Sequence, residues 1–569
     1  MERELINQPF KKSPIANLDG KPKIAYFSME IGINEQIPTY SGGLGVLAGD
    51  TIKSCADLNV PLVGVTLLSE KGYFYQKIDE NGNQLEMPIR FDVANFLKLL
   101  PSTTKIKIDG RNVKLRVWHY QYKGINDYMV PVFFLDSNIK GNDNWDREIT
   151  KHLYGGDEKY RLAQEIILGV GGVRILKALG YKTIDKYHMN EGHAALLTLE
   201  LYNQFKDIEK VREQCVFTTH TPVAAGHDHF DLSFAKPMIG DLLPDSFINE
   251  ITFENKLNMT KLALFFSHYV NGVAKKHGEI SRNLFPGHSI DSITNGVHSS
   301  TWVSKPFQRL FDKHIPGWRS DPFILRSAFN INKQEIWDSH SEAKRELIDF
   351  VNGRYNKGMN YYDFTIGFAR RQTEYKRPDL LISDPERLIN IAEKVGPIQI
   401  IYAGKAHPKD NSGKNSIKHI YDVMKSTNGK VKIAFIHNYN MRIGKIMTAG
   451  SDIWLNTPRR PFEASGTSGM KAAHNGVPQF STLDGWWLEG CIENITGWSI
   501  GTEKTVNDSS DDNKDRNDLY HKLETWIMPK FYKDRENWIR TMRSCIAINA
   551  SFFNTNRMVL QYVLNAYFM

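Results

Sequence analysis

The first segment whose residue types suit a chemical role is SGGLGVLAGD at 41–50, which precedes a helical pattern at 51–58. Backbone N–H groups of glycines can approach an oxyanion closely, and the N-terminus of a helix adds partial positive charge. We therefore expect an anion site at Gly42 and Gly43, with a plain helix-entry turn as the alternative. A dinucleotide site is less favoured, because that fingerprint follows its strand through a tight turn and a longer segment intervenes here.

A second segment, ARRQTEYKR at 369–377, carries four cations and directly follows an apolar run. If the run is a strand, these cations stand at its carboxyl end, where a phosphate would bind. Arginine offers paired N–H donors and lysine a mobile point charge. The alternative is a solvated charged surface, which is the usual fate of a charge run.

The third segment is EASGTSGMK at 463–471, where small residues precede a helical pattern. Backbone amides at such a position form another cradle for an anion. A lysine that is desolvated or held near other cations has a lowered pKa, so Lys471 could form a Schiff base. The alternative, which this segment taken alone slightly favours, is a helix-capping loop with a lysine on the surface.

A histidine-rich segment, HTPVAAGHDH at 220–229, raises the question of metal binding. Its H-x6-H-x-H spacing matches no zinc pattern, and the chain has no H-E-x-x-H, so we expect no metal. His220 follows an apolar run. It either lines a cleft or is a hydrogen-bonded structural histidine.

The elements that position these segments follow from short apolar runs that alternate with helical patterns, as in α/β folds with mostly parallel sheets. Helical, polar sequence at 295–355 separates two groups of runs. Ligands of such sheets bind at the carboxyl ends of the strands, and pockets favour domain interfaces. We expect two doubly wound domains, 1–296 and 297–569, with a cleft between them. The expected strands are 24–28, 61–68, 130–135 and 216–219, then 364–369, 398–403, 431–436 and 453–455; expected helical segments include 158–179 and 259–277.

Composition narrows the class of protein. The chain has 569 residues, 41% hydrophobic and 24% charged, which excludes a disordered or fibrous protein. Its net charge of +8 is mild, and its one compact basic cluster is too short to follow a nucleic-acid backbone. Four widely spaced cysteines favour a reducing cytoplasm. We expect no signal peptide and no membrane span, a mobile loop at 501–517, and a helical, packed tail at 519–569.

Taken together, these segments resemble the α-glucan phosphorylases of the short bacterial and archaeal type. The resemblance covers most of residues 23–501 and implies a GT-B glycosyltransferase fold with two Rossmann-like domains. It also implies reversible phosphorolysis of α-1,4-glucans to α-glucose 1-phosphate, with pyridoxal 5′-phosphate as cofactor. The blocks that carry it, in the family's order, include YFSMEIGINEQIPTYSGGLGVLAGD, NEGHAALL, TTHTPVAAGHD, SITNGVHSSTW, FARRQTEYKR, AGKAHP, LNTPRRPFEASGTSGMKAAHNG and LDGWWLEG.

The resemblance assigns cofactor-binding roles by position. Lys471 matches the lysine that holds the cofactor as a Schiff base. Thr467 and Ser468 match backbone contacts to the cofactor phosphate, and Arg370 takes a position that is usually lysine in the long animal and plant forms. The other implied cofactor contacts are Gly42, Gly43 and Tyr439.

It assigns substrate roles in the same way. Arg371 and Lys376 match the groups that bind substrate phosphate, and His220 matches a contact made through its carbonyl. The other implied sugar contacts are Asn295, Tyr375, Glu463, Ser465 and Gly466.

The implied reaction retains the configuration of the anomeric carbon. The cofactor phosphate exchanges a proton with substrate phosphate, which protonates the glycosidic oxygen and then attacks from the same face. Two phosphates in one cleft repel each other, so several cations and amide dipoles are needed. The carbonyl of His220 would stabilise the developing positive charge, and no glycosidase pair of carboxylates is required. The implied partners are an α-glucan and phosphate or glucose 1-phosphate, with no nucleic acid and no membrane; a homodimer is expected from base rate alone.

Two alternatives stay open. A sugar-nucleotide-dependent glycan synthase shares the SGGLG loop and a glutamate motif, but the position of its second glutamate, eight after Glu463, is Lys471 here. An inactive glycan-binding protein is the other, because fold alone does not prove activity. The regulatory and dimer-contact segments of the long phosphorylases are not recognisable, and the segment after Lys471 departs from them, which leaves the acceptor preference open.

Overall fold

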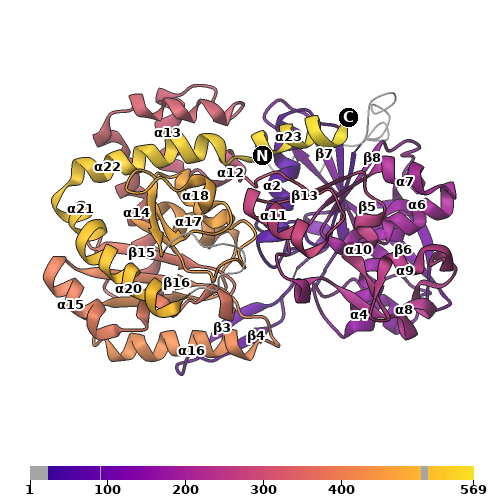
Figure 1. Ribbon diagram of the computed structural model, residues 1–569, viewed down its shortest axis with the longest axis horizontal. Helices are drawn as coiled ribbons and strands as arrows, with labels where there is room; N and C mark the ends of the chain where they lie inside the picture. The colour runs from indigo at the N-terminus through magenta and orange to yellow at the C-terminus, as the bar shows by residue number, and fades with distance from the viewer. Residues whose placement is uncertain (1–23, 90, 502–510, 569) are drawn as a thin grey trace.

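Two large sheets organise the protein, whose computed structural model describes residues 24–568 except residue 90 and residues 502–510 (Figure 1). Each sheet lies in its own lobe and belongs to its own buried apolar core. Most strand pairings are parallel, which confirms the expected α/β class. No helix in the described ranges is long and apolar enough to cross a bilayer.

The first sheet has nine strands in the order β14-β13-β9-β8-β1-β2-β7-β6-β5. The pairings from β14 to β7 are parallel, and β6 and β5 add an antiparallel edge. β1 is central and buried along its whole length, as expected for a strand covered on both faces. The bounds are β1 (Ile24–Ser28), β2 (Leu62–Leu67), β5 (Lys98–Ile108), β6 (Arg111–Lys123), β7 (Met129–Asp136), β8 (Lys186–Asn190), β9 (Cys215–Thr218), β13 (Tyr269–Gly272) and β14 (Asp291–Ser292).

The second sheet has six parallel strands in the order β17-β16-β15-β18-β19-β20. All eight predicted strands are present in the two sheets, within one residue at either end. Sequence patterns missed the other strands of the two sheets, which are β5, β6, β8, β13 and β14 in the first sheet and β19 and β20 in the second. The bounds are β15 (Phe364–Ala369), β16 (Ile398–Ala403), β17 (Lys432–Ile436), β18 (Ile453–Asn456), β19 (Gln479–Thr482) and β20 (Gly497–Ile500).

Helices fill the connections between strands, and several carry site residues. The predicted helical segment 158–179 is confirmed as α4, a π-helical turn at Ile167–Gly171, and α5. The main helices are α2 (Gly43–Asp57), α4 (Glu158–Ile166), α5 (Gly172–Ala178), α6 (Leu197–Phe205), α8 (Leu232–Ile239), α10 (Met259–Phe265), α11 (Lys275–Leu284), α13 (Lys305–His314), α14 (Lys333–Tyr355), α15 (Pro385–Val395), α16 (Asn411–Ser426), α17 (Met441–Gly450), α18 (Thr467–Ala473), α20 (Asp512–Lys522), α21 (Met528–Lys533), α22 (Arg535–Ser544) and α23 (Thr555–Tyr562).

Three sequence predictions were wrong in part. The segment 259–277 is not one helical stretch: α10 ends at Phe265 and β13 follows, because Val270 and Asn271 are buried in parallel pairing with β9. α2 begins at Gly43, so the glycines form its first turns and do not merely precede it. Of the predicted loop 501–517, residues 512–517 belong to α20, and residues 502–510 lie outside the described residues.

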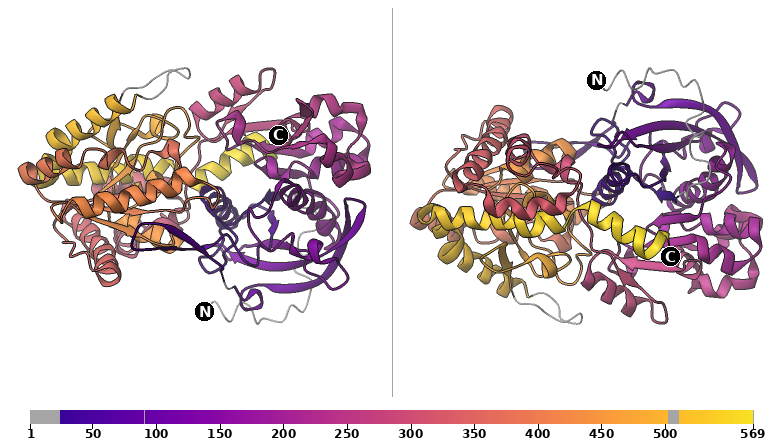
Figure 2. Two further views of the ribbon diagram at one scale, coloured as in Figure 1. Left: turned by 90° about the horizontal axis from the view of Figure 1, so that it is seen from below. Right: turned by 90° about the horizontal axis from the view of Figure 1, so that it is seen from above.

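The tail confirms the expected helical packing and returns to the first lobe. Figure 2 shows the yellow C-terminal helices running along one lobe and crossing to the other. Tyr562 Oη lies 3.1 Å from Thr218 Oγ1 and accepts a hydrogen bond from Asn271 Nδ2 at 3.0 Å. Tyr567 Oη lies 2.7 Å from His188 Nδ1. The C-terminal helices therefore pack against strands of the first sheet, while the expected domain boundary after Gly296 stays a prediction.

A hairpin of β3 (Tyr75–Ile78) and β4 (Gln84–Met87) makes the opposite connection, from the N-terminal half of the chain to the second lobe (Figure 1). Gln76 Nε2 donates to the carbonyl of Gly404 at 2.9 Å, and Gln84 Nε2 donates to the carbonyl of Ala406 at 3.0 Å. The two lobes are therefore in contact through the C-terminal helices and through the β3–β4 hairpin.

Candidate functional site

One cavity of about 1280 Å³ is lined by residues of both halves of the chain. Its walls come from the segment around α2, the loops after β8 and β9, the loop after β15, and the loop that leads into α18. Several of these loops leave the carboxyl ends of parallel strands, as predicted. Every residue to which the family resemblance assigns a role lines this cavity: Gly42, Gly43, His220, Asn295, Arg370, Arg371, Tyr375, Lys376, Tyr439, Glu463, Ser465, Gly466, Thr467, Ser468 and Lys471.

The glycine loop is held by a carboxylate that sequence analysis missed. Glu30 Oε2 accepts hydrogen bonds from the backbone N–H groups of Ser41 at 2.5 Å and Gly42 at 3.2 Å. Tyr154 Oη donates to the other oxygen of Glu30 at 2.9 Å. A β-carbon at Gly45 would lie 2.7 Å from Glu30 Oε2, so only glycine fits there without displacing that carboxylate. No pattern in the sequence marks Glu30, because it approaches the loop only after folding.

The cations after β15 surround a second carboxylate. Arg370 Nη2 donates to Glu463 Oε2 at 2.7 Å, and Lys376 Nζ donates to the same oxygen. The three side chains are nearly buried, at 8%, 9% and 10% exposure. Burial alone would raise the pKa of Glu463, but the charges of Arg370 and Lys376 outweigh it and lower that pKa. The site therefore holds two buried cations around one ionised carboxylate.

Arg377, the fourth cation of the segment, does not line the cavity. Its guanidinium makes a buried ion pair with Asp515 at 2.8 Å and a second pair with the half-exposed Asp512 at 2.7 Å. The hypothesis that all four cations dock a phosphate is therefore wrong for this residue. Its φ of +44° turns the chain just after Lys376, so the two side chains diverge.

Lys471 is buried at 6% exposure in α18, so the interpretation of this residue as a surface lysine is wrong. Its Nζ lies 3.9 Å from the centre of the Trp302 ring. Among the described residues no hydrogen-bond acceptor is paired with this amine. Burial lowers the pKa of Lys471 to about 8, so a sizeable fraction of the amine is unprotonated near neutral pH.

His220 lies at the end of β9, as the sequence predicted. Its backbone N–H donates to Glu191 Oε2 at 2.7 Å, and its Nε2 lies 2.7 Å from Asn190 Oδ1. Burial lowers the pKa of His220 to about 4, so the ring is neutral at physiological pH. The ring is therefore both hydrogen-bonded and part of the cavity wall, which joins the two roles that the sequence left as alternatives.

Two of the cavity residues with assigned roles carry buried polar atoms that no described residue satisfies. Asn295 Oδ1 and Ser465 Oγ are buried and have no hydrogen-bond partner in the described part of the chain. A buried polar atom without a partner is costly, so it is usually satisfied by water or a ligand. The carbonyl of Asn295 accepts from Arg557 Nη2 at 2.9 Å, which ties this wall to the C-terminal helices. These atoms are suited to hydroxyl groups of a bound sugar.

His227 and Asp228, from the same segment 220–229, take part in separate contacts. His193 Nε2 lies 3.2 Å from Asp228 Oδ2, which also accepts from Arg161 Nη2 at 2.9 Å. His227 Nδ1 lies 2.8 Å from Thr260 Oγ1. Within the described ranges no group of three or more His, Cys, Asp or Glu is arranged to hold a metal ion.

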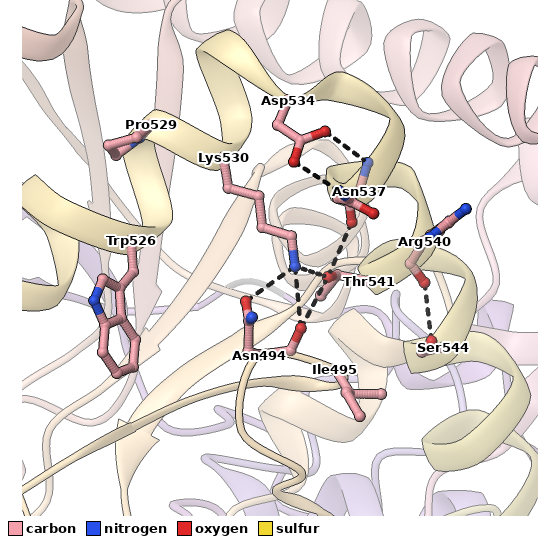
Figure 3. A pocket seen from close by; sticks show the side chains of 10 residues that line it. All are labelled: Asn494, Ile495, Trp526, Pro529, Lys530, Asp534, Asn537, Arg540, Thr541 and Ser544. Atoms are coloured by element: carbon pink, nitrogen blue, oxygen red, sulfur yellow. Dashed lines mark hydrogen bonds between the residues drawn. The ribbon is translucent and has the colours of Figure 1, made fainter.

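A second cavity, of about 820 Å³, lies between the loop that precedes β20 and the C-terminal helices (Figure 3). Lys530 donates to the carbonyl and Oδ1 of Asn494 at 3.0 Å each and to Thr541 Oγ1 at 2.8 Å. Asn537 Nδ2 likewise donates to Asp534 at 2.7 Å. These polar groups satisfy one another, and no residue with an assigned role lies there, so the first cavity is the candidate site.

The fold and this cavity define a two-lobed α/β protein whose polar site combines cations, a glycine loop and a buried lysine. A family model described as "Phosphorylase: Carbohydrate phosphorylase" matches residues 230–522. The chain is 37% identical to the maltodextrin phosphorylase of Thermococcus litoralis, over 95% of this chain and 70% of that one. It is 34% identical to the glycogen phosphorylase of Mycobacterium tuberculosis, over 96% and 70%, and 32% identical to that of Aquifex aeolicus, over 96% and 86%. The chain belongs to the carbohydrate phosphorylase family, and its parallel-sheet α/β architecture agrees with the GT-B fold expected for it.

Proposed function

We propose that this chain is a glycosyltransferase that catalyses the reversible phosphorolysis of α-1,4-glucans to α-D-glucose 1-phosphate, with retention at the anomeric carbon. The observation that carries the proposal is the buried amine of Lys471 in the same cavity as Arg370, Arg371 and Lys376, in a chain of this family. The names of the relatives, maltodextrin phosphorylase and glycogen phosphorylase, support the same substrate class.

The residues fit pyridoxal 5′-phosphate as the cofactor. Lys471 offers a buried amine with a lowered pKa, which suits attachment to an aldehyde. Arg370 and the backbone N–H groups of Thr467 and Ser468 offer positive charge and donors for a phosphate. Tyr439 and the glycine loop would complete the binding site. When bound, this cofactor supplies a phosphate that can give and take a proton.

The chain's own residues then have distinct tasks. Arg371 and Lys376 would bind substrate phosphate, and their charges would offset the repulsion between two phosphates in one cavity. The carbonyl of His220 would stabilise positive charge on the anomeric carbon. The sugar is oriented by hydrogen bonds to Asn295 and Ser465, whose free polar atoms suit hydroxyl partners. Tyr375, Glu463 and Gly466 line the same part of the cavity.

All four cysteines lie in the described ranges and are free thiols. This supports a reducing compartment, so we propose a cytoplasmic location. A homodimer stays a prediction.

The test is to supply the purified chain with pyridoxal 5′-phosphate, maltodextrin and phosphate, and to measure glucose 1-phosphate. Borohydride reduction followed by peptide mapping locates the cofactor in the same sample. We expect phosphate-dependent release and an adduct on Lys471, both absent in Lys471→Ala. An adduct without release, in a protein that binds glucan, would support the inactive binding protein. Glucosyl transfer from a sugar nucleotide without phosphorolysis would support the glycan synthase.

A further inference from the structure

A buried polar cluster lies directly behind Lys471, and the reaction described above uses none of its acidic groups. α2, which begins with the glycine loop, places Asp50 and Lys53 one turn apart on its buried side. Asp50 Oδ2 accepts hydrogen bonds from Trp302 Nε1 at 2.7 Å and from the backbone N–H of His298 at 3.1 Å. One carboxylate oxygen thus fixes the indole and the turn that carries it.

The Trp302 ring in turn lies against the amine of Lys471. Nζ lies 3.9 Å from the ring centre, within the range where an aromatic face attracts a cation. Rotation of the indole is opposed by the hydrogen bond of its Nε1 to Asp50. One intervening side chain, Trp302, therefore links Asp50 to the Lys471 amine, although residues 50 and 471 are far apart in sequence.

Asp50 has a second oxygen that the fold leaves unsatisfied. Oδ1 is buried and has no hydrogen-bond partner in the described part of the chain. A buried carboxylate oxygen without a partner costs free energy. Fold stability alone does not explain a charged group here, since an asparagine would keep an acceptor for Trp302 at a lower desolvation cost.

Charge provides a second link between these groups. The negative charge of Asp50 raises the pKa of Lys471, and the nearby Lys53 lowers it, while burial has the largest effect. Lys53 is itself buried, donates from Nζ to Thr301 Oγ1 at 3.2 Å, and has a pKa lowered to about 8.

Other titratable groups lie along the same cavity or at the end of α18. Arg370 and Tyr439 line the same cavity. His474, which caps the C-terminus of α18, has its Nε2 2.9 Å from Ser299 Oγ and its Nδ1 2.8 Å from the carbonyl of Met470.

We propose that Asp50 is a positioning residue for Lys471: it fixes the Trp302 ring against the amine and, opposed by Lys53, balances the charge around it. The inference rests on the proposed function, because it concerns attachment of pyridoxal 5′-phosphate. In that step the unprotonated amine adds to the aldehyde carbon. A C=N bond then forms, and both amine hydrogens leave with the aldehyde oxygen as one water molecule. Only the unprotonated amine can react, so the charge balance controls the pH at which attachment becomes fast.

The test follows the rate of attachment of pyridoxal 5′-phosphate to the full chain, stripped of cofactor, as a function of pH. Absorbance of the C=N group gives the rate, and borohydride trapping confirms Lys471 as the site. In Asp50→Asn the pH midpoint should fall by about half a unit or more, because a charge that favours the ammonium is lost. In Lys53→Met it should rise by a similar amount. Asp50→Glu, which keeps the charge, should stay near the wild-type midpoint.

Asp57→Asn is the matched control. Asp57 is also buried on α2 and accepts from His298 Nε2 at 2.8 Å, but it does not act on the pKa of Lys471. The pH midpoint of attachment in Asp57→Asn should equal that of the wild type. If circular dichroism shows that Asp50→Asn does not fold, the results for Lys53→Met and Trp302→Phe test the role of Asp50 instead. Trp302→Phe keeps a ring but loses the hydrogen bond to Asp50, so its attachment should be several-fold slower.

The outcomes separate the inference from the proposed function. Attachment at Lys471 with unshifted midpoints in the folded charge variants would overturn the role of Asp50 and leave the proposed function intact. No attachment in the wild type would overturn both.

Discussion

Gly42 lies so close to Arg371 that a β-carbon built on the glycine would stand 3.3 Å from the guanidinium nitrogen Nη2. The two residues come from opposite halves of the chain and meet at the wall of the cavity. The backbone φ of Gly42 is −157°, an extended value open to any residue. A larger residue at this position would therefore crowd the guanidinium, whereas the backbone conformation does not require glycine.

This contact leads to the first prediction. Gly42→Ala should displace the Arg371 guanidinium and raise the KM for phosphate about tenfold, because a small shift of a charged group weakens its contacts. The measurement is phosphorolysis at varied phosphate concentration. In Gly43→Ala the new β-carbon would meet no atom within 4 Å, so the KM for phosphate should rise less. An equal rise of the KM for phosphate in both variants would contradict the steric explanation.

Lys376 and Arg377 are adjacent in sequence but should behave differently when replaced. Lys376→Met should lower kcat/KM for phosphorolysis by about a hundredfold, since it removes a cation at the reacting phosphate. Arg377→Met should instead lower the free energy of unfolding by about 3 kcal/mol, because it leaves Asp515 short of one buried partner. Its KM for phosphate should be unchanged in the folded protein. Steady-state kinetics and denaturant unfolding on both variants check this, and a raised KM in Arg377→Met would argue against it.

Glu463 stabilises the two cations that it bridges. Glu463→Gln should lower the free energy of unfolding by about 3 kcal/mol, because Arg370 and Lys376 then lie buried without a counter-charge. Added phosphate should restore part of that stability by binding the same cations. Glu374→Gln is the control: Glu374 pairs with Arg459 but is 73% exposed, so its loss should change little. If denaturant unfolding finds Glu463→Gln as stable as the wild type, the prediction is wrong.

Asp484 should make stability depend on pH. Burial raises its pKa from 3.8 to about 7, although its oxygens accept from the N–H groups of Glu463 and Gly485 at 2.9 Å. Since the folded pKa lies above the unfolded one, the contribution of this group is full below pH 3.8 and is lost as pH rises toward 7.

Comparison with Asp484→Asn isolates this contribution. The free energy of unfolding of the wild type, taken relative to that of the variant, should fall by about 2 kcal/mol between pH 5 and pH 8. Denaturant unfolding at both pH values measures the difference. A difference independent of pH would show that the carboxyl is ionised throughout.

Local patterns were sufficient for the parts of the protein that depend on neighbouring residues. Apolar runs predicted β15 and β16 to the residue, because a strand buried on both faces is continuously apolar. The composition of the segments around Gly42, Arg371 and Lys471 predicted which loops line the cavity. The error at 259–277 also has a local cause, since a short buried strand beside two helices has no period of its own.

Contacts between distant residues were decided only by the tertiary structure. Nothing in the sequence distinguishes Lys376, which faces the cavity, from Arg377, which pairs with Asp515 of a C-terminal helix. Trp302 and Asp50 gained their places beside Lys471 through the packing of α2 against the second lobe. The sequence determined the residue types and the strand ends that carry them. The order of strands in the sheets and the docking of the two lobes decided which side chains meet, because those depend on the burial of surfaces far apart along the chain.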